Sequence, residues 1–320
     1  LFKLKTALKN ILYSSSFFED LGFKYIGPID GHNINQLCEA MDSAKMIAAP
    51  VLIHINTLKG RGYDYAEHSP EKFHGISRFD PHTGEPLSVG ENYSSFFGKL
   101  MCSFAAKDKR ICAITAAMTL GTGLEEFSTR YPERFFDVGI AEEHAVTFAS
   151  GLSAGGMLPV FAVYSTFLQR SADQLIHDGA LQRRKLIIAV DRAGFVGEDG
   201  ETHQGLFDVP LLQSLPNTTV YSPATYEEIN SALYSAFYKD SGLIVIRYPR
   251  GSEPEEAKGL PVPDEVDLFG DSAADTAIVT YGRLFFNALR AQEILAERGV
   301  NVKIVKLARI KPLPERTFEF

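Results

Sequence analysis

Glu142 has the surroundings of a residue that does chemistry. It follows "FFDVGI" (residues 135–140), a mostly apolar run typical of a buried strand, and it stands where a helical pattern begins. Apolar neighbours favour the protonated carboxyl, whereas the N-terminus of a helix favours the carboxylate. The sequence leaves open which effect dominates. A carboxyl balanced between the two can give and take a proton, although an acid in a first helical turn is also common without any such role.

Other polar side chains also follow strand-like runs. Tyr164 and Arg170 come after "LPVFAV", residues 192–203 come after "IIAVD", and Arg250 comes after "IRYP". Ligands of open α/β sheets bind at the carboxyl ends of the strands. The topology therefore predicts that these groups gather at one edge of a sheet.

Short binding motifs are incomplete. "GTG" at 121–123 lacks the third glycine of a dinucleotide loop, and "GRG" at 60–62 lacks the Lys-Ser/Thr ending of a P-loop. The three cysteines have no metal-binding spacing, and their sparse, odd number suggests a reducing, cytoplasmic compartment. A formal net charge of −8 argues against nucleic acid or an anionic membrane as the main partner. No apolar run has the length of a membrane span.

The elements that must position these residues alternate regularly. Between residues 91 and 250, strand-like runs such as "ICAIT" and "KLIIAVD" are separated by helical patterns such as "YSSFFGKLMCSFAAK". Apolar strands separated by helices are typical of parallel strands covered on both faces. The prediction is a doubly wound parallel α/β sheet.

The rest of the chain divides around this sheet. Residues 1–85 alternate strand and helix, residues 251–270 are rich in proline and acid and read as a linker, and residues 271–320 begin a further α/β unit. The first residue is not Met and the chain opens inside a helical pattern. We therefore expect it to be part of a longer polypeptide.

Longer stretches resemble one family. "DVGIAEEHAVTFASGLSAGG", "VYSTFLQRSADQLIHD", "VDRAGFVGEDGETHQGLFD" and "IRYPRG" are similar to the 1-deoxy-D-xylulose 5-phosphate synthases, thiamine-diphosphate enzymes of the transketolase superfamily. "YIGPIDGHN" and "KGRGY…FHGISRFDP" resemble the end of that family's first domain. The resemblance implies condensation of pyruvate with glyceraldehyde 3-phosphate, with loss of CO2, through the cofactor ylid. It implies the first step of non-mevalonate isoprenoid synthesis.

The resemblance also implies roles for individual residues. Glu142 would hydrogen-bond the aminopyrimidine of the cofactor, and His74 and His203 would act in catalysis. The other implied contacts each have an alternative, purely structural explanation, which is core packing, a tyrosine packed at a loop edge or a solvated surface loop. The implied cofactor contacts are Tyr63, Met118, Ile140 and Phe167, and the implied substrate contacts are Tyr164, Arg170, Arg192, Asp199 and Arg250, with Tyr164 and Arg250 on the acceptor phosphate. Phe167 and Arg170 are three residues apart and so share a helix face.

One part of the family pattern is absent. The family holds Mg²⁺ for the cofactor diphosphate with a GDG motif followed by a downstream Asn in its first domain. This sequence has no such motif, and its "EDG" at 198–200 lies in the wrong domain. We therefore expect the metal ligands to lie upstream, this chain alone to be inactive, and the complete enzyme to be a homodimer. Two alternatives stay open: another superfamily member such as the beta subunit of a 2-oxo-acid dehydrogenase, and a non-catalytic fragment or subunit.

Overall fold

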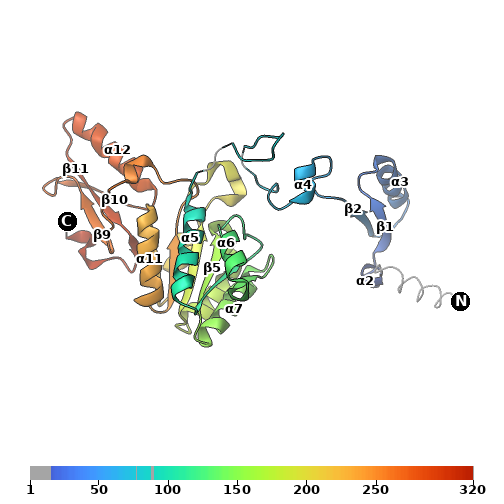
Figure 1. Cartoon of the computed structure of the whole chain (residues 1–320), viewed down its shortest axis with the longest axis horizontal. Coiled ribbons are helices and arrows are strands. Elements are labelled where there is room, and N and C mark those ends of the chain that lie inside the picture. The colour runs from blue at the N-terminus through green and yellow to red at the C-terminus, as the bar shows by residue number, and fades with distance from the viewer. Residues whose placement is uncertain (1–15, 77, 88–89, 320) are drawn as a thin grey trace. The chain divides into compact units, whose positions relative to one another are not determined.

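The computed structural model describes residues 16–76, 78–87 and 90–319 (Figure 1). Contacts within the chain divide it into two compact units, Leu1–Val89 and Gly90–Phe320, and each is described by itself. Among these described residues, no helix has the length and apolar character needed to cross a membrane.

The first unit is built around one β-α-β motif. β1 (Lys24–Asp30) and β2 (Val51–Asn56) pair in parallel, and α3 (Ile34–Lys45) connects them. Asn33 fixes the start of α3, because its side chain accepts a hydrogen bond from the backbone N–H of Gln36. This alternation of strand and helix is the one predicted from the sequence. The described residues of this unit also form the short helices α2 (Ser16–Asp20) and α4 (Asp64–His68).

The second unit contains a seven-stranded sheet with the strand order β12-β7-β8-β6-β5-β3-β4 among the described residues. All strand pairs in it are parallel except β12 with β7, which is antiparallel. The predicted doubly wound parallel α/β fold is confirmed. The strands are β3 (Ile111–Thr115), β4 (Phe135–Asp137), β5 (Leu158–Tyr164), β6 (Leu186–Asp191), β7 (Thr218–Tyr221), β8 (Leu243–Arg247) and β12 (Arg309–Lys311).

Helices cover both faces of this sheet. Successive side chains of a strand point to opposite faces, so neighbouring residues of one strand pack into different cores. Ile187 of β6 belongs to the core shared with α5 (Tyr93–Lys107) and α11 (Tyr226–Tyr238), which pack side by side (Figure 1). Ile188 belongs to the opposite core, shared with α7 (Glu142–Ala154). The first core also includes α6 (Glu125–Arg130), and the second includes α10 (Asp208–Gln213).

The segment after β5 is helical but irregular. The Ser171 hydroxyl bonds the carbonyl oxygen of Leu168, and the Asp178 carboxylate and carbonyl accept hydroxyl groups from Thr147 and Ser150 of α7. Such side-chain bonds compete with the α-helical ladder. The helical segment is therefore divided into short pieces. The segment comprises α8 (Ser165–Leu168), a 3₁₀ turn (Gln169–Ser171), α9 (Ala172–Gln174) and a π-helix (Leu175–Ala180).

The C-terminal residues form a second, smaller sheet in the same unit. β10 (Thr276–Tyr281) pairs in parallel with β11 (Val302–Leu307), and β11 pairs antiparallel with β9 (Val266–Phe269). α12 (Leu284–Glu297) connects β10 to β11. β9 lies inside residues 251–270, which the sequence predicts to be a linker. A strand of four residues is hard to recognise in a sequence so rich in proline and acidic residues. β12 then returns to the edge of the large sheet.

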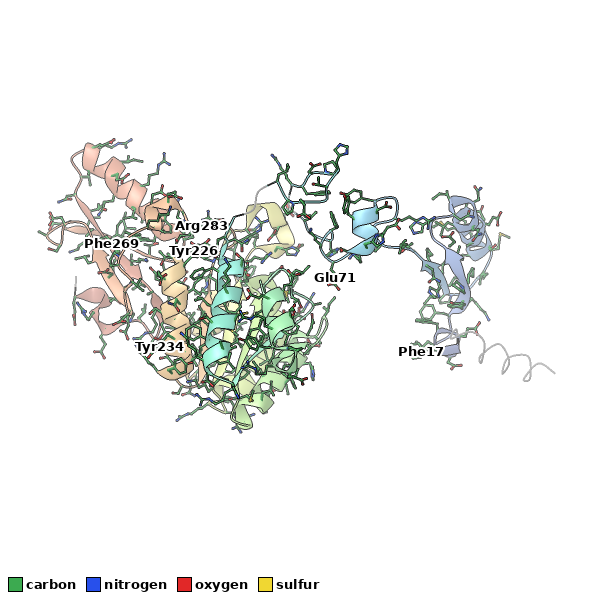
Figure 2. The ribbon with its side chains drawn as sticks, viewed as in Figure 1. Phe17, Glu71, Tyr226, Tyr234, Phe269 and Arg283 are labelled. Carbon is green, nitrogen blue, oxygen red and sulfur yellow. The ribbon has the colours of Figure 1, made fainter. Side chains whose placement is uncertain are left out.

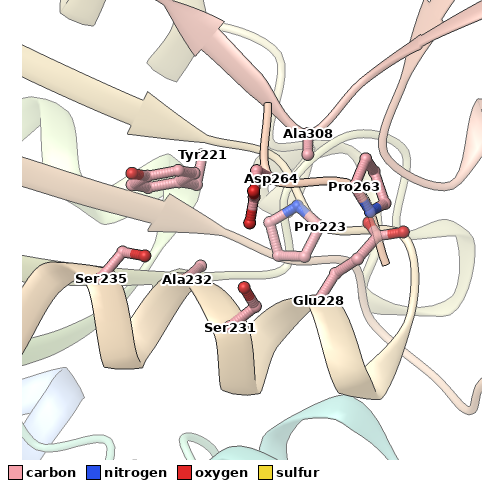
Figure 3. A pocket seen from close by; sticks show the side chains of 9 residues that line it. All are labelled: Tyr221, Pro223, Glu228, Ser231, Ala232, Ser235, Pro263, Asp264 and Ala308. Carbon is pink, nitrogen blue, oxygen red and sulfur yellow. The ribbon is translucent and has the colours of Figure 1, made fainter. Parts of the chain in front are cut away.

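A buried ion pair joins α11 to β11. The Lys306 ammonium contacts Oε1 of Glu228, and the two side chains are 0% and 2% exposed. Oε2 of Glu228 accepts the backbone N–H of Ala224 at 2.8 Å, and the Phe285 ring centroid lies 4.3 Å from the ammonium. Figure 3 shows a small pocket on the Glu228 side of α11. It is lined by Tyr221, Pro223, Glu228, Ser231, Ala232, Ser235, Pro263, Asp264 and Ala308, none of which the sequence predicts as a site residue.

Candidate active site

Asp137, the last residue of β4, ties two strand-end loops together. Its Oδ1 accepts the backbone N–H groups of Ala117 at 2.8 Å and Gly139 at 3.0 Å, and its Oδ2 accepts the Thr119 hydroxyl at 3.0 Å. Ala117 has a φ of 59°, which is unfavourable for a residue with a Cβ, so the bond from Asp137 helps to hold it. The chain thus enters α7 from a fixed turn, with Glu142 as the first helical residue.

Glu142 is 1% exposed and has one satisfied and one unsatisfied oxygen. Its Oε1 accepts a hydrogen bond of 2.9 Å from Nη1 of Arg170. Its Oε2 is buried and has no hydrogen-bond partner among the described residues. A buried polar atom that has lost water without gaining a partner is unfavourable. The unsatisfied oxygen therefore marks a place where an atom of a ligand can complete the hydrogen bonding.

The two aliphatic residues predicted to contact a cofactor differ in burial. Met118 is 8% exposed and packs in the core that contains α7. Ile140 is 77% exposed, so core packing does not explain this side chain within the second unit. An exposed isoleucine two residues before a buried carboxyl offers apolar surface to a ligand that reaches Glu142.

Aromatic rings stack after β5. Tyr164 and Phe167 lie with ring centroids 5.9 Å apart and an interplanar angle of 19°, and His203 meets Phe167 edge-on at 5.4 Å. The Arg170 guanidinium lies 4.9 Å from the Phe167 centroid, so the three-residue spacing brings these side chains together as predicted. Because Arg170 also binds Glu142, the stack and the carboxyl form one site.

Asp199 bridges two of the predicted substrate-binding arginines. Its Oδ2 lies 3.2 Å from Nε of Arg192, and its Oδ1 lies 3.0 Å from Nε of Arg250. The carbonyl oxygen of Arg250 accepts a hydrogen bond of 2.8 Å from Arg283, which is labelled in Figure 2. Burial raises the pKa of Tyr164, whose ring lies 3.7 Å from the Arg192 guanidinium, so its hydroxyl remains a donor at neutral pH. Two guanidinium groups and a phenol form a donor set that suits phosphate.

The loop that carries Asp199 and His203 is closed at its base. Gly194 and Gly205 exchange two backbone hydrogen bonds, of 2.8 and 2.7 Å. A Cβ at Gly205 would lie 2.3 Å from the carbonyl oxygen of Arg192, so this close approach requires glycine. The loop between these two glycines therefore has a fixed base.

Two predicted site residues belong to the first unit. Tyr63 packs edge-on against Phe73 and donates a hydrogen bond of 3.0 Å to the carbonyl oxygen of Pro81. These contacts match the loop-edge packing that the sequence offers as the alternative for this tyrosine. His74 is exposed in a turn of the same unit.

Sequence reasoning missed three residues of the site. Asp137 and Asp191 each end a strand just before a predicted site residue, and that position was the available signal. Gly121 has no such signal. Its carbonyl oxygen accepts a hydrogen bond of 2.8 Å from Nη1 of Arg192, and a Cβ on it would lie 1.7 Å from the Tyr164 hydroxyl. The incomplete "GTG" motif is thus explained by close packing.

Comparison with known proteins identifies the family of this chain. Residues 91–255, more than half of the chain, match the family model described as "Transketolase, pyrimidine binding domain". The chain belongs to this family. Residues 1–57 match the model "1-deoxy-D-xylulose-5-phosphate synthase", and residues 270–319 match "Transketolase, C-terminal domain".

Relatives of this transketolase-family chain point to one group. A protein named 1-deoxy-D-xylulose-5-phosphate synthase from Clostridium acetobutylicum is 47% identical over 320 residues, which cover 98% of this chain and 51% of the relative. A protein of the same name from Clostridium kluyveri is 48% identical over 97% of this chain and 50% of its own length. The chain thus spans about half the length of the curated relatives it matches. Its predicted homology to these synthases is confirmed.

Solved structures show the same fold. A split-gene transketolase, solved as an inactive beta4 tetramer, is 26% identical with a TM-score of 0.62 and covers 70% of this chain and 73% of its own. A transketolase from Pichia stipitis has a TM-score of 0.62 over 94% of this chain and 57% of its own. At 15% identity, that second likeness shows the fold alone.

Proposed function

We propose that this chain acts in the reaction of a 1-deoxy-D-xylulose 5-phosphate synthase, the condensation of pyruvate with glyceraldehyde 3-phosphate with loss of CO2. The sequence identity of 46–48% to relatives of that name supports the assignment. The single observation that carries it is the buried oxygen of Glu142 that has no hydrogen-bond partner among the described residues. The two arginines that Asp199 bridges in the same unit are suited to phosphate.

The residues around Glu142 fit the aminopyrimidine part of thiamine diphosphate. Oε2 of Glu142 lacks a partner within the described residues, and a protonated ring nitrogen can supply one. Ile140 and Phe167 offer apolar and aromatic surface nearby in the chain. The bound cofactor supplies an electron sink for the electrons that remain when pyruvate loses CO2.

The side chains of this chain then have distinct tasks. Glu142 holds or releases a proton at Oε2, while Arg170 balances its charge through Oε1. Tyr164, Arg192 and Arg250 bind the phosphate of the acceptor aldehyde. Asp199 keeps the two arginines at a fixed spacing and shares its loop with His203, which contacts the substrates from that loop.

The acceptor assignment is tested by Arg250→Ala. Losing one charge-assisted phosphate contact costs roughly 1.5–3 kcal/mol, so kcat/KM for glyceraldehyde 3-phosphate should fall about ten- to hundredfold. The value for unphosphorylated glyceraldehyde should stay within about threefold. The assay uses this chain joined to the half of the Clostridium acetobutylicum relative that it does not cover. We call this fusion the reconstituted enzyme.

Arg110→Ala is the matched control for Arg250→Ala. Arg110 is exposed, pairs with Asp108 at 2.7 Å and precedes β3 at the opposite end of the strand from the site. Its removal should leave both aldehydes unaffected. Equal losses for both aldehydes in Arg250→Ala would show that this arginine has a structural role only.

We also propose that Mg²⁺ and the cofactor diphosphate need residues outside this chain, and that the working enzyme is a homodimer in the cytoplasm. The relatives are about twice as long as the matched segment, and the split-gene transketolase in its beta4 form is inactive. Cys38, Cys102 and Cys112 are all free thiols, as a reducing compartment favours.

Calorimetric titration tests the metal proposal. Magnesium with thiamine diphosphate should bind this chain at least about a hundredfold more weakly than the reconstituted enzyme, because a diphosphate needs a hard cation held by oxygen ligands. Tight, magnesium-dependent binding to this chain alone would show that it contains the whole cofactor site. The reconstituted enzyme, titrated in parallel, shows that the cofactor and buffer are competent.

A further inference from the structure

A buried acid directly precedes the arginine that faces Tyr164. Asp191 is the last residue of β6 and is 0% exposed. Its Oδ1 accepts the backbone N–H of Arg192 at 2.7 Å and lies 3.3 Å from Nη1 of the same residue. One carboxylate thus holds both the backbone and the guanidinium of Arg192.

Arg192 has a backbone conformation that needs such support. Its φ is 58°, in the left-handed region that residues with a Cβ rarely adopt. Its guanidinium is held on other sides by the carbonyl oxygen of Gly121 at 2.8 Å, by Asp199 at 3.2 Å and by the Tyr164 ring at 3.7 Å. Strained residues of this kind persist where the surroundings fix them, often at functional sites.

The other oxygen of Asp191 is unsatisfied. Within the described residues neither Oδ2 of Asp191 nor the hydroxyl of Tyr248 has a hydrogen-bond partner, and both are buried. Tyr248 follows β8, whose Arg247 is in register with Val190. Burial raises the pKa of Asp191 to about 6 and raises that of Tyr248 well above its usual value. The charged or titratable groups that act on this pair are Arg192 and Tyr164, and Asp199 and Arg250 act in turn on Tyr164.

We propose that Asp191 is a positioning residue: its carboxylate holds Arg192 in the left-handed conformation that directs the guanidinium toward the acceptor-phosphate site beside Tyr164. The phosphate as ligand rests on the proposed function. The positioning itself rests on the contacts of Asp191. Near neutral pH the carboxylate is ionised and balances the charge of Arg192.

Positioning and simple electrostatics predict opposite results for Asp191→Asn. The amide keeps the shape of the carboxyl but removes a negative charge 3.3 Å from the guanidinium. If charge alone mattered, the more positive site would bind an anion more tightly. If the carboxylate positions Arg192, the variant should bind an anion more weakly although the site has become more positive.

Sulfate binding to this chain, followed by nitrogen-15 NMR at pH 7.5, shows whether Asp191→Asn binds an anion more weakly or more tightly. Sulfate is the probe because it does not titrate between pH 5 and pH 8. Asp191→Asn should bind it roughly tenfold more weakly, the effect of one misplaced charge-assisted contact. The control is Asp208→Asn, which neutralises another buried carboxylate, one that pairs with Arg247 at 2.7 Å. Equal or tighter binding in Asp191→Asn, or an equal loss in the control, overturns the proposal.

The backbone amide signal of Arg192 gives a second measurement that needs no ligand. In the unmodified chain and in Asp208→Asn, the chemical shift of this signal should change with pH around a midpoint near pH 6. In Asp191→Asn, its chemical shift should differ from that of the unmodified chain and should not change with pH. If the unmodified chain binds no sulfate, the proposed phosphate site fails while this signal still decides the positioning. If the Arg192 signal of Asp191→Asn coincides with the Arg192 signal of the unmodified chain at high pH, the positioning role of Asp191 is disproved.

Discussion

Glu142→Gln in the reconstituted enzyme should slow exchange of the cofactor C2 proton about 10²- to 10⁴-fold, the range expected when a positioned acid–base group is lost. Oε2 of Glu142 is the atom without a partner among the described residues, and Oε1 is already bound to Arg170. An amide at Oε2 cannot accept and return a proton as a carboxylate does. The fold should survive, because glutamine fills the same space at the start of α7.

The measurement is loss of the C2 proton signal in deuterated buffer, recorded by proton NMR at saturating cofactor. Glu143→Gln is the matched control, since Glu143 is the next residue of the same helical turn and is exposed. It should exchange at the unmodified rate. An unchanged rate in Glu142→Gln, with normal cofactor binding, would remove Glu142 from the proposed role.

Breaking the Lys306–Glu228 pair should lower the free energy of unfolding by about 3–5 kcal/mol, in Lys306→Met and in Glu228→Gln alike. Each single change leaves the other partner buried beside apolar groups. In Glu228→Gln the ammonium loses its charged partner and retains the weaker attraction of the Phe285 and Phe269 rings. The double variant Lys306→Met, Glu228→Leu should regain most of the loss, because no uncompensated charge remains.

Urea unfolding of the chain, followed by circular dichroism, measures these differences. Lys303→Met is the matched control, because Lys303 lies on the same strand and its ammonium bonds the exposed carbonyl of Ser272 at 3.1 Å. It should change the unfolding free energy by less than about 0.5 kcal/mol. Single variants at 306 and 228 as mild as this control would show that the pair does not hold α11 to β11.

The strands and most helices of the second unit could be predicted because burial imposes strong patterns. The quoted run "YSSFFGKLMCSFAAK" coincides with α5, and "KLIIAVD" contains β6. A strand buried on both faces must be apolar along its whole length, so it stands out from its neighbours. The same patterns placed Tyr164, Arg170, Arg192, Asp199 and Arg250 at strand ends, where the structure brings them together through the Asp199 bridge and the ring contacts.

The unpredicted features depend on contacts between residues that are distant in the sequence. Gly121 is needed because the Tyr164 hydroxyl lies where a Cβ would be, and no local pattern reveals that neighbour. The broken helix after β5 depends on hydroxyl groups of α7. Asp191 looks like the polar end of an apolar strand, and only its burial and its two bonds to Arg192 show its importance. The roles of Tyr63 and His74 stay predictions.

The return of β12 to the edge of the large sheet has a consequence for synthesis on the ribosome. β12 pairs with β7, but Arg309 is made about 90 residues after Tyr221, which takes roughly 5–20 s at the usual rate of elongation. During that interval one edge of β7 has N–H and C=O groups without a strand partner. Exposed edges of this kind pair readily with other chains. Nascent chains of this protein should therefore recruit chaperones most strongly after β8 emerges, and should lose that dependence once Lys311 has left the exit tunnel.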